Sequence, residues 1–229
     1  QKDTVEIAAV GDIMLGTDYP EKKYLPPNDK CDFLLSPLKP FIETSDIAFA
    51  NLEGAFNDGA ELVKKCNDPS VCYAFRTPQK YFACIVQSGL NLFSLANNHI
   101  FDFGMPAVDS TLSLIDRANS HTAGIYKRPF AVFVKDSVTY GFTAFSPNKG
   151  TNDFHDTVRL VRTVQALDDT ADIVIVSFHM GAEGRKHQHL TRKTEMYYGE
   201  NRGNPYKMAR KVIDAGADTV FGHIFQSLA

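Results

Sequence analysis

Asp172-Ile-Val-Ile-Val-Ser-Phe178 decides the fold, because this short and almost wholly apolar run leads directly into His179. A run of this length that is apolar on both faces is typical of a strand buried inside a sheet. Four further runs share this form and also end in polar residues: Val5–Val10, Asp46–Ala50, Asn91–Ala96 and Asp218–Phe221. The sequence therefore predicts five buried strands with polar side chains at their carboxyl ends.

Stretches with helical character separate the predicted strands, and several of them begin at proline, which suits a first helical turn. They span residues 37–44, 78–88, 106–118, 157–169 and 205–215. The alternation of strand and helix predicts an α/β fold with a largely parallel sheet. The runs at 131–134 and 139–145, joined by Lys135-Asp-Ser137, predict an additional antiparallel hairpin.

Length and charge exclude several classes of protein. The 229 residues are 44% hydrophobic, enough to bury a full core in one large domain. Lys and Arg number 24 against 27 Asp and Glu, without a basic cluster of the kind that binds nucleic acid, so we expect no nucleic-acid partner. The longest apolar runs fall well short of the roughly 18 residues that a membrane helix needs. We therefore expect a soluble chain.

The first residue and the cysteines suggest a location outside the cytosol. The chain begins at Gln1 rather than Met, so we expect that a signal or anchor has been removed from a secreted, periplasmic or cell-surface protein. Cys66 and Cys72 bracket a turn-rich stretch that could close a small disulfide loop, and Cys31 and Cys84 make the count even. The alternative of four unrelated thiols stays open.

Side chains that can bind a metal or move a proton follow all five predicted strands. They are Asp12, Glu53, Asn98, His99, His179 and His223. Ligands of open α/β sheets bind beyond the carboxyl ends of the strands, so we expect these side chains to converge. Each one alone is open to a plainer interpretation as a turn or cap residue, but a cap has no need of histidine. Carboxylate, imidazole and amide groups suit one or two divalent ions such as Mn, Zn, Fe or Mg, and such ions favour hydrolysis.

Five segments occur in an order that is known from one family. They are Gly11–Gly16, Asn51–Gly54, Leu95–Gly104, Phe178–Glu183 and Ile213–His223. Together they resemble the capsule-synthesis proteins of the CapA/PgsA type, which are associated with poly-γ-glutamate capsules and have a calcineurin-like metallophosphoesterase fold. The resemblance implies a single domain over residues 1–229. It also implies an α/β/β/α sandwich of mixed sheets with a metal site at the strand carboxyl ends.

The resemblance also implies a role for each strand-end residue that can bind a metal. Asp12 would hold one metal ion, and Glu53 would stand at the position of the bridging carboxylate. Asn98, His179 and His223 would complete a second metal site.

Catalytic roles follow from the same resemblance, and substrate contacts are predicted beside them. His99 would act as general acid toward the leaving group, with Asp102 orienting its ring or raising its basicity. The predicted substrate contacts are Asn51, Asn97, Glu183 and Arg185. Glu183 could instead orient the imidazole of His179 or face solvent, and the basic loop from Arg185 to Lys193 could attract a polyanion or simply be solvated.

Two positions depart from the expected pattern. Met14 stands where phosphoesterases of this fold usually have His, and Gln226 stands where the family's final His is expected. The chain stops at Ala229, so we expect a truncated C-terminus. The first hypothesis is a metal-dependent hydrolase that acts on an anionic polymer such as poly-γ-glutamate, or on a phosphoester. The alternative is a non-catalytic component that binds or tethers polymer in a membrane capsule-synthesis complex.

Overall fold

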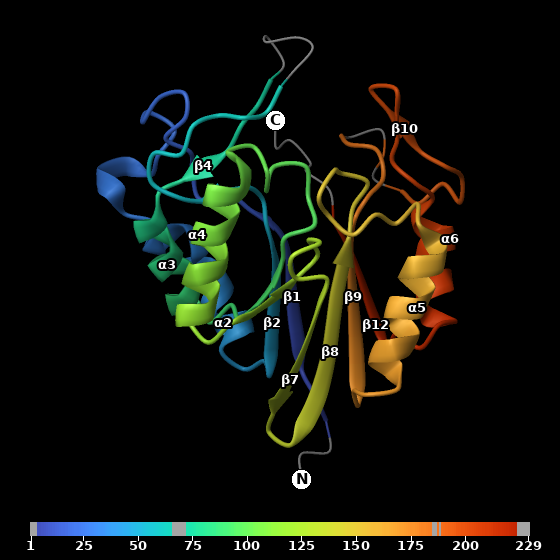
Figure 1. Ribbon diagram of the computed structural model, residues 1–229. Coiled ribbons are helices and arrows are strands. Elements are labelled where there is room, and N and C mark those ends of the chain that lie inside the picture. The colour runs from blue at the N-terminus through green and yellow to red at the C-terminus, as the bar shows by residue number, and fades with distance from the viewer. Residues whose placement is uncertain (1–3, 66–71, 185–186, 188, 224–229) are drawn as a thin grey trace. The chain divides into compact units, whose positions relative to one another are not determined.

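The chain folds as two compact units in the computed structural model, which describes residues 4–65, 72–184, 187 and 189–223 (Figure 1). The N-terminal unit comprises Thr4–Phe93 and Asn98–His121. Among the described residues, the C-terminal unit comprises Ser94–Asn97 and those from Thr122 to His223. The single domain over residues 1–229 stays a prediction.

The first sheet has four strands in the order β1-β2-β5-β6, and β1, β2 and most of β5 belong to the N-terminal unit. Its strands are β1 (Ile7–Ile13), β2 (Ile47–Leu52), β5 (Leu92–Ser94) and β6 (His121–Ala123). β1 and β2 are parallel, and β2 is buried at all of its positions, which agrees with a sequence that is apolar except at Asn51. A second, two-stranded parallel sheet pairs β3 (Ala55–Phe56) with β4 (Arg76–Thr77).

The helices of the N-terminal unit are mostly short. They are α1 (Asp32–Leu35), α2 (Lys39–Ile42), α3 (Phe82–Gln87) and α4 (Gly104–Arg117), with 3-10 turns at Pro27–Asp29, Ser36–Leu38 and Gln79–Tyr81. The predicted helix over residues 37–44 is instead a 3-10 turn followed by α2. Pro40 accounts for this break, because proline has no N–H to donate within a continuous helix. α4 is longer because buried side chains such as Val108, Leu112 and Ile115 recur at helical spacing.

Disulfide bonds are present, which excludes free thiols at three of the four cysteines. Cys31 is bonded to Cys84 and so links the start of α1 to α3. Cys72 is also disulfide-bonded. The predicted disulfide loop from Cys66 to Cys72 includes residues 66–71, which lie outside the described residues.

The C-terminal unit contains a mixed four-stranded sheet with the order β12-β9-β8-β7. Its strands are β7 (Phe130–Lys135), β8 (Val138–Phe145), β9 (Ile173–His179) and β12 (Thr219–His223). β8, β9 and β12 are parallel, and β7 pairs with β8 as the predicted antiparallel hairpin. A small ribbon of β10 (Met196–Tyr197) and β11 (Glu200–Asn201) follows β9.

Two helices pack on this sheet and lie side by side, α5 (Thr157–Asp168) and α6 (Pro205–Ile213) (Figure 1). Leu160 and Val164 of α5 are fully buried against Val174, Val176 and other residues of β9. The side chain of Asp156 caps α5, and Asn204 caps α6 just before Pro205, as the preference of Asp, Asn and Pro for helix starts predicts. This packing fixes the carboxyl ends of β9 and β12.

The mixed α/β fold with parallel strands is confirmed in both units. Among the described residues, no helix combines the length and the apolar character that crossing a membrane requires.

Candidate functional site

Asp12 lies where the pairing of β1 with β2 is irregular. Ala9 faces Phe49, but Asp12 faces Asn51, so β1 contains one extra residue over this interval. Such β-bulges re-aim a side chain and are common near active sites. Here the bulge brings the carboxylate of Asp12 opposite the amide of Asn51.

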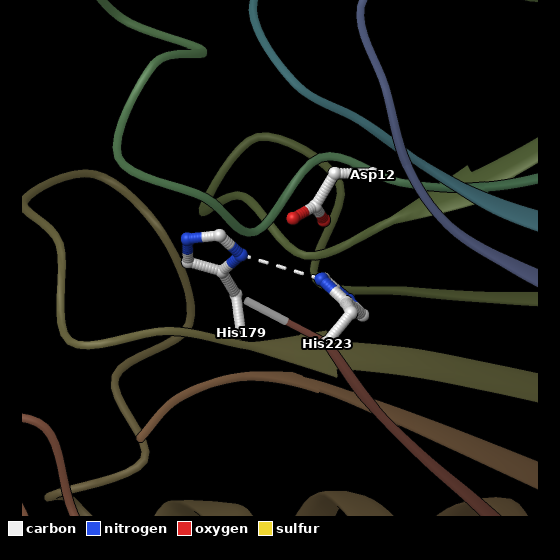
Figure 2. A group of neighbouring side chains, drawn as sticks. All are labelled: Asp12, His179 and His223. Carbon is white, nitrogen blue, oxygen red and sulfur yellow. Dashed lines mark hydrogen bonds between the residues drawn. The ribbon is translucent and has the colours of Figure 1, made fainter. Parts of the chain in front are cut away.

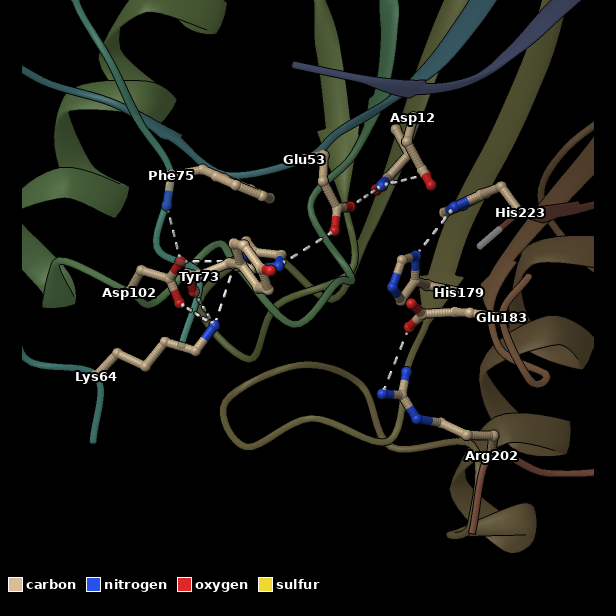
Figure 3. A network of polar contacts seen from close by, with 12 residues as sticks. Asp12, Glu53, Lys64, Tyr73, Phe75, Asp102, His179, Glu183, Arg202 and His223 are labelled. Atoms are coloured by element: carbon tan, nitrogen blue, oxygen red, sulfur yellow. Dashed lines mark hydrogen bonds and ion pairs between the residues drawn. The ribbon is translucent and has the colours of Figure 1, made fainter. Parts of the chain in front are cut away.

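The buried amide of Asn51 holds two carboxylates. Its Nδ2 donates to Asp12 Oδ1 at 2.8 Å and to Glu53 Oε2 at 2.7 Å. Asn51 and Glu53 are both buried, so these bonds form away from bulk water. Figure 3 shows the carboxylates of Asp12, on β1, and Glu53, directly after β2, at the two ends of these contacts. The structure thus gives Asn51 a positioning role, and its contact with substrate stays a prediction.

His99 and Asp102 lie in the turn after β5 and are in direct contact. His99 Nδ1 is 2.7 Å from Asp102 Oδ2, and Asp102 is only 2% exposed. A carboxylate can only accept hydrogen bonds, so the ring carries its proton on Nδ1. The other nitrogen, Nε2, then presents its lone pair and lies 3.9 Å from Glu53 Oε1.

The protonation state of His99 is set mainly by burial. Burial lowers the pKa of His99 below its usual value, and this effect outweighs Asp102, which raises the same pKa. Lys64 lowers the pKa further through its positive charge. His99 is therefore a neutral imidazole near neutral pH, able to accept a proton at Nε2.

The loop before β4 supplies residues that the sequence reasoning missed. Lys64 Nζ lies 3.0 Å from Asp102 Oδ1, 3.2 Å from His99 Nδ1 and 2.9 Å from the carbonyl oxygen of Tyr73 (Figure 3). The backbone N–H of Phe75 donates to Asp102 Oδ2, and its ring packs on the imidazole with centroids 4.1 Å apart. A single Lys in a polar loop has no sequence pattern that would reveal such contacts.

His179 and His223 occupy paired positions at the carboxyl ends of the adjacent parallel strands β9 and β12. Their Nδ1 atoms are 3.3 Å apart (Figure 2), and His223 Nε2 lies 2.8 Å from Ser177 Oγ. When Nε2 donates to Ser177, His223 Nδ1 carries a lone pair directed toward His179.

The spacing of the two imidazoles fits a shared ion. In a tetrahedral site with metal–nitrogen bonds of about 2.0–2.1 Å, two ligand nitrogens are about 3.3–3.4 Å apart. The observed Nδ1–Nδ1 distance of 3.3 Å matches that separation. The donor chemistry and the geometry of His179 and His223 therefore suit a divalent metal.

The other predicted residues lie in different settings. Asn97 is 1% exposed and Asn98 is half-buried, both in the turn after β5. Glu183 Oε1 lies 3.7 Å from Arg202 Nη2, a partner that the sequence reasoning did not identify. Arg185 lies outside the described residues. The metal, catalytic and substrate roles of all these side chains stay predictions.

Comparison with curated proteins gives two relatives that are both named CapA. The chain is 22% identical over 246 residues to the capsule biosynthesis protein CapA of Bacillus anthracis, covering 97% of this chain and 54% of that protein. It is 23% identical over 240 residues to the PGA biosynthesis protein CapA of Bacillus subtilis (strain 168), covering 96% of this chain and 57% of the relative. The chain thus spans about half the length of the curated relatives it matches.

Two solved structures share the fold. A hypothetical protein from Thermus thermophilus gives a TM-score of 0.53 at 15% identity, over 96% of this chain and 67% of that protein. A Staphylococcus aureus protein described as a "Putative 5'-Nucleotidase", in complex with alpha-ketoglutarate, gives 0.55 at 14% identity, over 97% of this chain and 48% of that protein. These likenesses support the predicted metallophosphoesterase-like α/β fold class.

The sequence profile of one family covers nearly the whole chain. The family described as "Bacterial capsule synthesis protein PGA_cap" matches residues 6–225, which include the strand-end residues of both units. The chain therefore belongs to the bacterial capsule synthesis protein (PGA_cap) family.

Proposed function

We propose that this chain is a metal-dependent hydrolase of the phosphoesterase type that serves capsule biosynthesis. The observation that carries the proposal is the pair of imidazoles at the ends of β9 and β12, with Nδ1 atoms 3.3 Å apart. Neighbouring strands that both end in histidine supply nitrogen ligands from a rigid sheet. Family membership supports the link to capsules.

His179 and His223 are the proposed ligands of a divalent ion, and Asp12, Glu53 and Asn98 stay predicted ligands. Imidazole suits Zn, Mn or Fe, whereas Mg prefers oxygen ligands, so the histidine pair favours a transition metal. A bound ion would supply a Lewis acid that polarises a phosphoryl or carbonyl oxygen. Asn51 would keep the carboxylates of Asp12 and Glu53 oriented.

His99 is the proposed proton-transfer residue, and its reactive atom is Nε2. The neutral ring first accepts a proton at Nε2, and the resulting imidazolium can then donate that proton to a leaving group. Asp102 fixes the tautomer and stabilises the imidazolium, since it accepts from Nδ1 at 2.7 Å. Phe75 packs on the ring and limits its movement.

The proposed substrate is an anionic polymer such as poly-γ-glutamate, or a phosphoester. The name of the Bacillus subtilis relative supports the polymer, and the alpha-ketoglutarate bound to the Staphylococcus aureus neighbour is also a carboxylate. We also propose a secreted, periplasmic or cell-surface location, within a membrane capsule-synthesis complex. The bond between Cys31 and Cys84 supports this location, because disulfides persist mainly outside the cytosol.

Metal content and hydrolysis together test the proposal. We expect purified protein to bind a divalent transition metal after reconstitution, and to cleave a generic phosphodiester or a γ-glutamyl peptide only when loaded. His179→Ala and His223→Ala should each weaken metal binding by more than about 100-fold, because loss of outer-sphere partners alone costs about 10–100-fold. His155→Ala is the matched control, since that imidazole contacts the carbonyl oxygen of Asn201 instead.

The outcomes separate the two hypotheses. Failure of the protein to retain a transition metal after reconstitution would contradict the hypothesis of a metal-dependent hydrolase. Loaded protein that cleaves neither substrate but binds polymer supports the non-catalytic tether instead.

A further inference from the structure

Arg202 is a buried cation with unused hydrogen-bonding capacity. Arg202 is only 6% exposed, and its Nη1 has no hydrogen-bond acceptor among the residues that the structure describes. Its Nε lies 2.9 Å from Glu200 Oε2 but is not aligned for a hydrogen bond. Since a guanidinium carries five N–H donors, burying it in this way is costly unless an acceptor arrives.

The backbone holds Arg202 close to the carboxyl end of β9. The N–H of Gly181, two residues after His179, donates to the carbonyl oxygen of Arg202 at 2.8 Å, and the N–H of Arg202 donates to the carbonyl oxygen of Glu195 at 2.8 Å. The aromatic ring of Tyr197 lies under the guanidinium, 5.6 Å from its centroid. The cation is therefore fixed beside the chain segment that follows a proposed metal ligand.

The segment around Arg202 is built rigidly. Glu195 accepts a hydrogen bond from the N–H of Ala182 at 2.8 Å and another from Thr191 Oγ1 at 3.1 Å. Gly181 has a φ of +99°, and a Cβ there would lie 3.1 Å from Glu195 Oε2, so the close approach requires glycine. The position of Arg202 is thus fixed by contacts that do not involve its guanidinium.

Glu183 makes a loose ion pair with Arg202. The distance from Arg202 Nη2 to Glu183 Oε1 is 3.7 Å, beyond hydrogen-bonding range, and 22% of the Glu183 side chain is exposed (Figure 3). A partly exposed pair of this length contributes little energy, so the contact with Arg202 does not itself prevent another anion from replacing the carboxylate there. The carboxylate of Glu183 thus occupies a position beside Arg202 that an incoming oxyanion could take.

We propose that Arg202 is an anion-binding residue whose guanidinium exchanges Glu183 for a carboxylate or phosphate group of the substrate. The proposal rests on the proposed function for its location beside His179, and it deepens that function by naming the recognised group. A planar guanidinium binds two oxygens of one carboxylate or phosphate at once, which an ammonium cannot do. Glu183 and Glu200 together outweigh the single positive charge of Arg202, so binding of an anion in the wild-type protein is weak.

The test measures anion binding to the full chain by titration calorimetry in the presence of a chelator. The probes are inorganic phosphate and a γ-linked glutamate oligomer, which distinguish the two sources of the oxyanion. Glu183→Gln removes the competing carboxylate and should raise the affinity about fivefold, which is about 1 kcal/mol. Arg202→Met should lower the affinity at least tenfold, and Arg202→Lys should restore only part of it because lysine lacks the planar fork.

Arg210→Ala is the matched control, because Arg210 is a cation of α6 that lies against Tyr206. It should leave the affinity unchanged. A purely structural pair of Arg202 with Glu183 predicts that Glu183→Gln leaves the affinity unchanged or lowers it, and that result overturns the proposal. An Arg202→Met variant that binds the anion as tightly as the wild-type protein also overturns the proposal.

Glu183→Gln decides the question even where Arg202→Met fails to fold, because it leaves the buried cation in place. The assay contains no metal. A change in anion affinity on substitution of Arg202 or Glu183 therefore supports this proposal even if the protein proves not to be a metal-dependent hydrolase.

Discussion

At the scale of single residues, three side chains set the chemistry by what they hold in place. Asn51 orients two carboxylates, Asp102 fixes the tautomer of His99, and Ser177 contacts the far nitrogen of His223. In each case a hydrogen-bonding neighbour determines which lone pairs a functional group presents. The tautomers and orientations follow from hydrogen bonding rather than from the identity of the functional residues alone.

Asn51→Ala should destabilise the metal-free protein by about 1–3 kcal/mol, because two hydrogen bonds from a buried amide to carboxylates are lost. Urea denaturation in the presence of a chelator measures the change. Gln165→Ala, an exposed substitution on α5, should stay within about 0.5 kcal/mol of wild type.

Asn51→Asp adds a pH signature to the same experiment. It places a third carboxylate beside Asp12 and Glu53, so part of the lost stability should return as the pH falls and one carboxyl group becomes protonated. A loss that is the same at every pH would show that Asn51 does not act on these carboxylates.

At the scale of elements, the sequence predicted the parts that repeat a strong pattern. The runs that lead into Asp12 and His179 are largely apolar, and the structure confirms them as strands β1 and β9. β9 is buried as predicted, whereas β1 is only partly buried, so the prediction of a fully buried strand was wrong there. β6, β10 and β11 were missed because two or three residues are too few to show an alternation. The bulge in β1 was missed as well, since it depends on pairing with β2.

Contacts between distant segments explain the site residues that were missed. Lys64 is 38 positions before Asp102, and Arg202 is 19 positions after Glu183, so neither pair forms a motif. By contrast, His99 and Asp102 belong to one turn and His179 ends a strand, so local sequence was enough to predict where they lie.

The disulfide between Cys31 and Cys84 ties α1 to α3 across a sequence separation of 53 residues. Closing a loop of this size stabilises a domain by about 2–5 kcal/mol. The Cys31→Ser, Cys84→Ser double variant should therefore unfold at a lower urea concentration than wild type. The wild-type protein measured after reduction, which also breaks the disulfide of Cys72, should be no more stable than the variant. Equal stability of the oxidised wild type and the variant would contradict the role of the bond between Cys31 and Cys84.

At the scale of the whole molecule, each unit contributes its own functional groups. The N-terminal unit holds the carboxylates of Asp12 and Glu53 and the dyad of His99 and Asp102. The C-terminal unit holds the imidazole pair and the buried Arg202. The family match over residues 6–225 includes residues of both units.

The central claim is that the imidazoles of His179 and His223 bind one divalent ion. X-ray absorption spectroscopy of the zinc-loaded full chain tests it most directly, because it counts the imidazole nitrogens bound to the metal. We predict two imidazole nitrogens at about 2.0–2.1 Å, one of which is lost in His179→Ala and one in His223→Ala, with His155→Ala unchanged. A spectrum with oxygen ligands only, or one that neither histidine substitution alters, would contradict the claim.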